Sequence, residues 1–348
     1  MREIRKVEHI HCAINLPDGP LNPGFNDIRL VHNALPELSL AQVDTRVTVF
    51  DTRLELPVLV NAITGGNQQV LDINRALAKA AYLEGFGIAV GSQTGALIDS
   101  DLEETFSVVR RENPTGLVIA NVGAGVDAKQ ALRAIKMVEA NALQVHLNVP
   151  QELAMLEGDR DFRNLVDNVG DILEMSPVPV IVKEVGFGLS LEAARTLQRL
   201  GVSWVDVGGA GGTNFVAIEH KRGQESPVPV DWGIPTAISL AEVIYACPGL
   251  QVIASGGIRS PLDTVKALAL GASLAGIAGM WLKSLMEKPF EDLIGELRSF
   301  KQNLKYLFLL LGAQNVAELS KTPLVIAGPT GEWLRERGVD TKSWAQKR

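Results

Sequence analysis

The chain has 348 residues, 33 of them basic and 40 acidic, so its formal net charge at pH 7 is −7. This negative balance disfavours nucleic acid as a partner, and a total of two cysteines excludes a disulfide framework and a thiolate metal cluster. The start of the chain lacks the apolar core of a signal peptide and the uncharged stretches are too short for a membrane span, so we expect a cytoplasmic protein.

Residues 47–56 predict a small hairpin that plugs the N-terminal end of the fold that follows. Eight short aliphatic runs then predict eight strands, most of them ended by glycine, asparagine or another polar residue. The expected strands are 58–62, 87–90, 117–121, 143–147, 178–183, 204–207, 252–254 and 274–277. Helical patterns between them cover 70–84, 103–112, 128–139, 162–174, 191–200, 237–246 and 261–270. This alternation is typical of parallel βα units with right-handed crossovers.

Two glycine-rich runs at the last two strands favour a barrel over an open sheet. Ser255-Gly256-Gly257-Ile258-Arg259 and Gly276-Ile277-Ala278-Gly279 each follow a buried-strand pattern at the start of a helical stretch. Backbone N–H groups that glycine leaves free at a helix N-terminus bind anions. Two such runs in consecutive units match the phosphate grip after strands 7 and 8 of a barrel. The sequence therefore predicts a (β/α)8 TIM barrel, an α/β fold, that holds a phosphorylated cofactor.

The other segments extend this domain and do not form a second one. We expect an N-terminal arm and hairpin over 1–56, the barrel over 57–285, and C-terminal helices and a tail over 286–348. An amphipathic helix is predicted for 290–311. The stretch 208–235, rich in glycine and proline, is the longest expected βα loop, and long loops in compact domains are commonly functional.

Polar residues follow most of the expected strands, at the rim where the active sites of such barrels lie. They are Asn61, Thr64, Ser92, Gln93, Thr94, Asn121, His146, Asn148, Gln151, Glu152, Lys183, Glu184, Thr213 and Asn214. Helix capping is the alternative role for Thr64, Ser92 and Thr213. Capping needs neither the amides, the lysine nor the histidine, so the set as a whole predicts a binding or catalytic site.

Lys183 is the most informative of these residues. It ends the apolar run 178–182, where an unpaired cation is costly. Pairing with Glu184 is the structural alternative, although adjacent strand residues point to opposite faces. An amine at this place can stabilise an anionic ring, such as the N1–C2=O edge of a reduced flavin.

Three further patterns have weaker implications. Residues 121–128 fit the dinucleotide fingerprint G-x-G-x-x-A, but the next strand lacks the acidic residue that such a site requires, so we reject a Rossmann NAD(P) site. Beside His146, the pair Gln151 and Glu152 is either solvated or, through one carboxylate, a ligand for Mg²⁺. The basic cluster Arg5, Lys6, His9 and His11 is either a disordered tail or an arm that contacts a diphosphate.

Taken together, these motifs resemble the type 2 isopentenyl-diphosphate isomerase family, in the right order from Arg5 to about Gly312. The matching runs are Arg5–Ile10, Ala62–Gly66, Gly91–Gln93, His146–Glu152, Val182–Glu184, Gly211–Thr213 and Ser255–Arg259. The Ser-Gly-Gly-Ile run is shared with other FMN barrels such as α-hydroxy-acid oxidases. The resemblance implies FMN, Mg²⁺, a flavin kept reduced by NADPH, and a homo-octamer or homo-tetramer.

By the same resemblance, individual positions take roles. FMN would be bound by Ala62, Ile63, Thr64, Ser92, Asn121, Lys183, Thr213, Gly256, Gly257, Arg259, Ala278 and Gly279. The diphosphate substrate would be bound by Arg5, Lys6, Ser92, Gln93, Thr94 and Gln151, and Mg²⁺ by Glu152. Thr94 departs from the family pattern, in which many members carry a longer or basic residue after Ser-Gln. The tail after Pro323 matches no family motif.

The implied reaction is a 1,3-allylic proton shift between isopentenyl and dimethylallyl diphosphate, in isoprenoid biosynthesis and without net redox change. One proton is added to the terminal alkene carbon and another leaves C2, which requires an acid and a base around an apolar substrate without water. Cys247, before Pro248 at a helix end, lies too far from the rim to serve as the cysteine of the flavin-free isomerases. Our hypothesis is that N5 of reduced FMN exchanges the proton and Lys183 stabilises the anionic charge. Gln151 and His146 would then position the substrate or relay protons.

Two alternatives stay open. An FMN-dependent α-hydroxy-acid oxidase or dehydrogenase requires a histidine base and arginines near the later strands, where this chain has Gly209-Ala210-Gly211-Gly212. A non-catalytic flavin- or phosphate-binding protein would lack Lys183, Gln151 and Glu152 at the rim.

Overall fold

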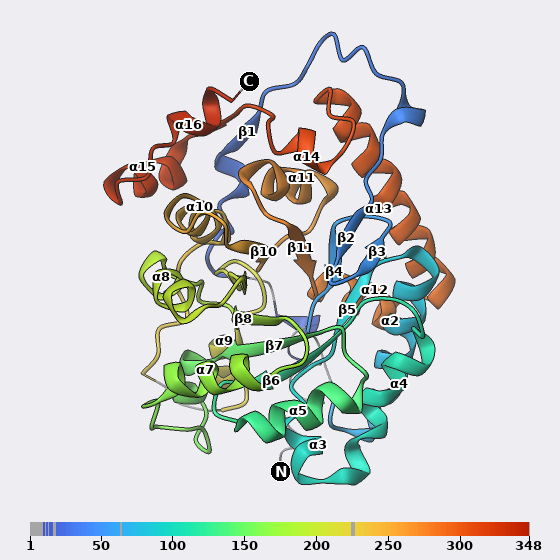
Figure 1. The fold of residues 1–348 in the computed structure, drawn as a ribbon, viewed down its shortest axis with the longest axis vertical. Helices are drawn as coiled ribbons and strands as arrows, with labels where there is room; N and C mark the ends of the chain where they lie inside the picture. Colours follow the sequence, from blue (N-terminus) through green and yellow to red (C-terminus); the bar gives the residue numbers. More distant parts are fainter. Residues whose placement is uncertain are drawn as a thin grey trace.

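The structure is a computed structural model that describes residues 10, 12, 14–16, 19–62, 65–223 and 227–347. Eight parallel strands close into a barrel in the order β10-β11-β4-β5-β6-β7-β8-β9 (Figure 1). They are β4 (Val58–Val60), β5 (Gly87–Ala89), β6 (Val118–Gly123), β7 (Ala142–Leu147), β8 (Val180–Glu184), β9 (Trp204–Asp206), β10 (Gln251–Ser255) and β11 (Leu274–Ile277). All eight predicted strands are present, and the (β/α)8 barrel is confirmed.

The seven predicted helices between strands are also present around the barrel (Figure 1). They are α2 (Leu71–Glu84), α4 (Glu104–Glu112), α5 (Ala128–Met137), α7 (Leu165–Met175), α8 (Leu191–Leu200), α10 (Thr236–Ala246) and α11 (Pro261–Leu270). Capping side chains fix where several of these helices begin. The Asp127 side chain accepts from the Gln130 N–H in a capping box, and Ser260 caps α11, whose first residue is Pro261.

Short helices in the loops were not predicted. Helices α3 (Thr94–Ile98), α6 (Val149–Ala154), α9 (Phe215–Lys221) and α12 (Gly279–Glu287) follow strands at the carboxyl-terminal rim. The structure also contains 3₁₀ helices η1 (Phe25–Asp27), η2 (Leu40–Gln42), η3 (Gln68–Val70) and η4 (Ser100–Leu102). Helix α9 lies inside the 208–235 loop, which is the longest βα loop as expected.

The predicted hairpin consists of β2 (Val47–Val49) and β3 (Thr52–Leu54). Val49 and Leu54 pack in one cluster with inward-facing strand residues, among them Leu59 and Ile181. The Phe50 ring lies 4.7 Å, centroid to centroid, from the indole of Trp204 at the start of β9. The hairpin therefore plugs the N-terminal end of the barrel. A larger apolar cluster fills the layer between the strands and the outer helices.

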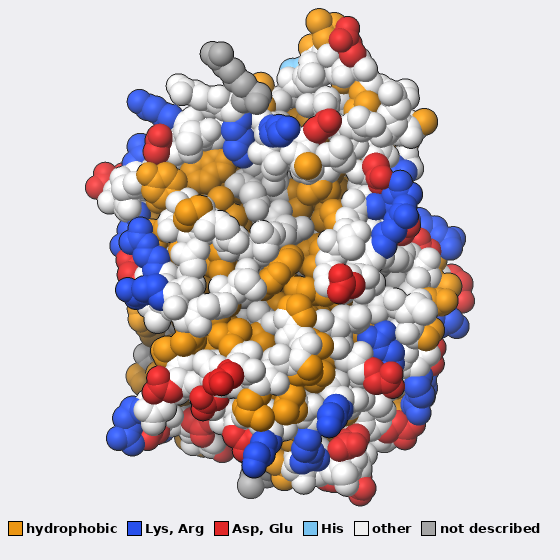
Figure 2. All heavy atoms as spheres, viewed as in Figure 1, with side chains coloured by type: hydrophobic (Ala, Val, Ile, Leu, Met, Phe, Trp, Pro, Cys, Tyr) orange, Lys and Arg blue, Asp and Glu red, His pale blue; other side chains and the backbone are white. Residues whose placement is uncertain are grey.

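The C-terminal region adds the predicted long helix, α13 (Phe290–Leu310), and an unpredicted strand, β12 (Leu324–Ile326). β12 pairs antiparallel with β1 (Ile28–Leu30), so a segment before the barrel is joined to one after it. Helices α14 (Val316–Leu319), α15 (Gly328–Glu336) and α16 (Lys342–Ala345) also lie in this region. Figure 2 shows one face on which Lys and Arg alternate with Asp and Glu around the edge and apolar side chains run through the middle. Among the described residues, no helix has the length and apolarity to cross a membrane.

Candidate functional site

The loops after β9 and β10 pack backbone against backbone. A Cβ on Gly212 would lie 2.7 Å from the Gly257 nitrogen, and one on Gly257 would lie 2.4 Å from the Gly211 oxygen. Gly256 and Gly257 also have φ of 107° and 81°, a region that side chains disfavour. Glycine is therefore required here by space and by conformation.

The loop after β11 joins the same place. A Cβ on Gly279, the first residue of α12, would lie 3.8 Å from Oγ1 of Thr213 in the loop after β9. Strands β10 and β11 are themselves neighbours, with Ser255 opposite Gly276. The two glycine-rich runs therefore end side by side, as the predicted phosphate grip requires.

The loops at residues 211–213, 256–259 and 278–279 together form a glycine cradle. It presents backbone N–H groups and the cation of Arg259. Within the described residues, the N–H groups of Gly256, Gly257 and Ala278 donate to no backbone acceptor, and the first turn of α12 leaves further N–H groups without helical partners. The Arg259 guanidinium is held over the loop because it donates to the carbonyl oxygens of Gly257, at 3.0 Å, and Gly211. This donor set fits a terminal phosphate such as that of FMN.

Lys183 lies beside the cradle, inside the mouth of the barrel, with 8% of its surface exposed. Its Nζ lies 3.2 Å from Oδ2 of Asp206 and donates to the Glu184 carbonyl oxygen at 2.9 Å. A third contact, to Oγ of Ser255, is 3.3 Å long. The ammonium therefore pairs with a carboxylate from the next strand and not with the Glu184 carboxylate, which corrects the structural alternative considered from the sequence.

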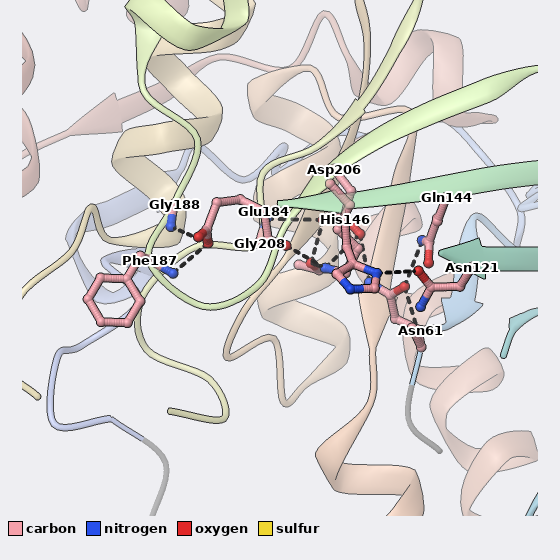
Figure 3. Close-up of polar contacts among 12 residues, drawn as sticks. Asn61, Asn121, Gln144, His146, Glu184, Phe187, Gly188, Asp206 and Gly208 are labelled. Carbon is pink, nitrogen blue, oxygen red and sulfur yellow. Dashed lines mark hydrogen bonds and ion pairs between the residues drawn. The ribbon is translucent and has the colours of Figure 1, made fainter. Parts of the chain in front are cut away.

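The Glu184 carboxylate instead holds the loop that follows β8. It accepts from the N–H groups of Phe187 and Gly188, the latter at 2.9 Å (Figure 3). Burial is the main cause that raises the pKa of Glu184 to about 7, although these N–H groups act in the opposite direction. Its role is therefore to shape the loop.

Asp206 is the site residue that the sequence analysis missed. It is fully buried, and in addition to Lys183 it accepts from Asn61 Nδ2 at 2.7 Å, from Gly208 N at 3.1 Å and from Ser255 Oγ. Figure 3 labels Asp206 together with Asn61 and Gly208 of this network. Its signal in the sequence is an acid in the otherwise apolar run 204–207. That its side chain points inward becomes visible only in the strand register.

His146 and Asn121 lie close together on neighbouring strands (Figure 3). Nδ1 of His146 is 2.9 Å from Oδ1 of Asn121, while Nδ2 of Asn121 donates to the Val90 carbonyl oxygen. Because that donation turns the Asn121 oxygen toward the ring, the arrangement favours the tautomer of His146 with a hydrogen on Nδ1. Nε2 is then the proton-accepting position of the neutral imidazole.

Gln93 does not lie as predicted for a substrate ligand. Its side chain is fully buried; Nε2 donates to the Ala134 carbonyl oxygen of α5 at 3.0 Å, and Oε1 accepts from Asn121 N at 2.9 Å. The amide is thus used to join α5 to β6 and is turned away from the mouth. Its neighbours Ser92 and Thr94 lie with their hydroxyl oxygens 3.1 Å apart.

Gln151 and Glu152 lie in the first turn of α6, directly after β7. Oε1 of Glu152 accepts from Asn148 Nδ2 at 2.7 Å, and Oε2 accepts from Asp159 N at 3.0 Å. In the described ranges, no group of three or more His, Cys, Asp or Glu side chains is placed to hold a metal ion. Glu152 is therefore an oriented single carboxylate, which suits Mg²⁺ that takes its other ligands from phosphate and water.

Ala62 is among the described residues, whereas several other predicted positions are not. Ala62 follows Asn61, whose Oδ1 accepts from the Ala62 N–H at 2.9 Å. Arg5, Lys6, His9, His11, Ile63 and Thr64 lie outside the described residues. Cys247 is buried at the end of α10, away from the rim as expected.

Part of the chain matches a family model, and solved structures share its fold. Residues 158–326 match the model of the FMN-dependent dehydrogenase family. Solved structures of mandelate oxidase, alone and with (S)-2-phenylpropionate, share the fold with TM-scores of 0.65 and 0.67 at 19% and 20% identity. The first covers 94% of this chain and 97% of that one, and the second 92% and 94%.

Much higher identity links the chain to isopentenyl-diphosphate delta-isomerases. The Bacillus pumilus protein is 46% identical over 342 residues, covering 98% of this chain and 96% of that protein. The Symbiobacterium thermophilum protein is 46% identical over 358 residues, covering 100% and 99%. Because this identity extends over nearly the whole of each chain, the chain belongs to the isopentenyl-diphosphate delta-isomerase family.

Proposed function

We propose that this protein is an isomerase that interconverts isopentenyl and dimethylallyl diphosphate by a 1,3-allylic proton shift, in isoprenoid biosynthesis. The observation that carries the proposal is the buried ammonium of Lys183 beside the glycine cradle and Arg259. A phosphate seat next to a fixed cation suits a flavin mononucleotide whose reduced ring is anionic. The names and identity of the relatives then indicate the reaction.

FMN would be held at both of its ends. The N–H groups of Gly256, Gly257 and Gly279, with Arg259, would take the phosphate, and Lys183 would face the anionic part of the ring. When bound and reduced by NADPH, FMN supplies an acid–base group to the site. The other predicted FMN positions keep the roles stated from the sequence, with Ser92, Asn121 and Thr213 at the same rim.

The diphosphate of the substrate would lie near α3 and α6. Ser92, Thr94 and Gln151 offer hydroxyl and amide groups there, and Arg5 and Lys6 would add positive charge. Glu152 would hold Mg²⁺ together with the diphosphate oxygens, because each of its carboxylate oxygens accepts one hydrogen bond from the described residues and retains a lone pair. The Gln93 side chain has no part in this proposal.

His146 and Gln151 would position the alkene or move protons. The hydrogen bond that Nδ1 of His146 donates to Oδ1 of Asn121 fixes the ring, and Nε2 would then accept or return a proton. The apolar barrel wall below the mouth would exclude water that could trap cationic character on the substrate. We further propose a cytoplasmic homo-octamer or homo-tetramer.

The test uses the purified protein with FMN. It should show the visible spectrum of oxidised flavin and, after chemical reduction without NADPH, should convert isopentenyl to dimethylallyl diphosphate. Stoichiometric NADPH consumption during turnover would contradict a proton shift. Bleaching of the flavin by lactate or glycolate would instead favour an α-hydroxy-acid oxidase, whose fold this chain shares. Flavin binding without turnover would favour a non-catalytic binder.

A further inference from the structure

Asp206 has an environment that the proposed reaction does not by itself require. Oδ2 faces Lys183 Nζ at 3.2 Å and Asn61 Nδ2 at 2.7 Å, and Oδ1 accepts from Gly208 N and Ser255 Oγ. An ionised carboxylate accepts hydrogen bonds and donates none, so its two oxygens match four donors. No exposed water-facing edge remains, because the residue is fully buried.

The donors reach Asp206 from several strands. Lys183 is its register partner on β8, Asn61 follows β4 across the barrel, and Ser255 ends β10. Gly276 on β11 provides the room, since a Cβ there would lie 2.7 Å from the Asn61 amide nitrogen. The carboxylate is therefore fixed by the fold itself, before any ligand binds.

We propose that Asp206 is a positioning residue that holds the Lys183 ammonium in place for the anionic part of the reduced flavin. The inference rests on the proposed function. A lysine side chain has four rotatable bonds, and pairing with a carboxylate that cannot move removes most of that freedom. Asp206 would thus act on the flavin through Lys183 and without touching it.

Two other roles for Asp206 predict different results. If it acted through its charge alone, removing it would leave the ammonium uncompensated and would raise the reduction potential of the flavin. If it supported the fold alone, removing it would lower stability and leave the potential unchanged. If Asp206 positions Lys183, Asp206→Ala should lower the reduction potential of the flavin, as Lys183→Met should, because the ammonium leaves its place beside the ring.

The experiment measures the reduction potential of bound FMN in the holoenzyme, for wild type, Asp206→Ala, Lys183→Met and the double variant. Asp206→Ala should lower the preference for reduced over oxidised flavin about tenfold, equal to about 30 mV for a two-electron couple. In the Lys183→Met background the same substitution should change nothing further. A rise in potential, an unchanged potential, or additive effects in the double variant would each overturn the proposal.

Two variants separate position from charge and from folding. The Asn61 side chain contacts Asp206 but not Lys183 in the described network, and Asn61→Ala removes no charge. This variant should therefore lower the flavin potential as Asp206→Ala does, but by a smaller amount. Glu242→Gln removes another buried carboxyl charge, which accepts from Trp333 and Arg337 on the outer layer. It should lower stability and leave the flavin potential as in wild type.

A second readout needs no flavin, so it separates this inference from the proposed function. In FMN-free protein, reductive methylation of Lys183 by formaldehyde, followed by mass spectrometry, should be at least about fivefold faster in Asp206→Ala and unchanged in Glu242→Gln, because the restrained amine is released. Equal rates in wild type and Asp206→Ala would refute the positioning role. If the wild-type protein bound no FMN, but Lys183 was still methylated faster in Asp206→Ala than in wild type, the proposed function would be refuted and the positioning role would stand.

Discussion

Glu184 is a carboxyl group whose burial has a measurable consequence for stability. Because burial raises its pKa from the ordinary 4.5 to about 7, the folded protein holds a proton more tightly than the unfolded chain between these values. Its contribution to the free energy of unfolding is therefore complete below about pH 4.5 and is lost as the pH rises through 7. The full loss is about 3 kcal/mol at most.

Glu184→Gln tests this dependence. An uncharged amide oxygen can still accept from Phe187 and Gly188, so the loop after β8 keeps its shape. We expect the variant to lose the fall in unfolding free energy that wild type shows between pH 5 and 8. Urea unfolding at several pH values measures this, and parallel pH curves for the two proteins would contradict it.

The site residues in the mouth of the barrel were predictable where they stand at the end of a strand. The residues with which they form ion pairs and hydrogen bonds were not predictable. Lys183 stands out because a cation ends an apolar run. Its partner Asp206 depends on the register of β8 against β9, which the sequence does not show. Gln93 illustrates the reverse case, since its amide could face either the mouth or α5 until the path of the chain decides.

At the scale of elements, the strands and the longer helices were predictable because their periodic patterns extend over enough residues. Helices α3 and α6, with five and six residues, are too short for periodicity to appear. β12 has three residues, and its partner β1 lies almost three hundred positions earlier in the chain. Pairing at that distance is set by tertiary packing and not by local sequence.

The contact between the β9 and β10 loops gives a prediction for one glycine. In Gly257→Ala the new Cβ would meet the Gly211 oxygen at 2.4 Å, in a backbone conformation with φ of 81°. The loops must separate, which distorts the phosphate cradle, so we expect at least about a tenfold loss of FMN affinity and about 1–3 kcal/mol of stability.

Gly125 provides the matched control, because a Cβ there would have no atom within 4 Å. Gly125→Ala should leave FMN affinity unchanged and the free energy of unfolding within about 0.5 kcal/mol of wild type. Flavin fluorescence titration and denaturant unfolding measure both quantities. If Gly257→Ala bound FMN as well as Gly125→Ala does, the cradle would not be the phosphate seat.

For the molecule as a whole, the barrel separates stability from function along its axis. Apolar side chains such as Leu59, Ile181 and Ile253 fill the lower interior with the hairpin. Polar and charged side chains, among them Lys183 and Asp206, occupy the upper interior beneath the rim loops. Barrel enzymes carry their chemistry at the carboxyl ends of the strands, so changes at the two ends should have different effects.

Leu54→Ala in the hairpin tests that separation. Leu54 is 1% exposed and packs against the inward-facing strand residues, so truncation leaves a cavity and should cost about 2–5 kcal/mol in unfolding free energy. Leu35, 81% exposed, is the control, and Leu35→Ala should stay within about 0.5 kcal/mol of wild type. At temperatures where the variants are folded, FMN affinity and isomerase kcat should match wild type in both. A loss of FMN affinity in Leu54→Ala, without unfolding, would mean that the plug and the rim are coupled through the barrel interior.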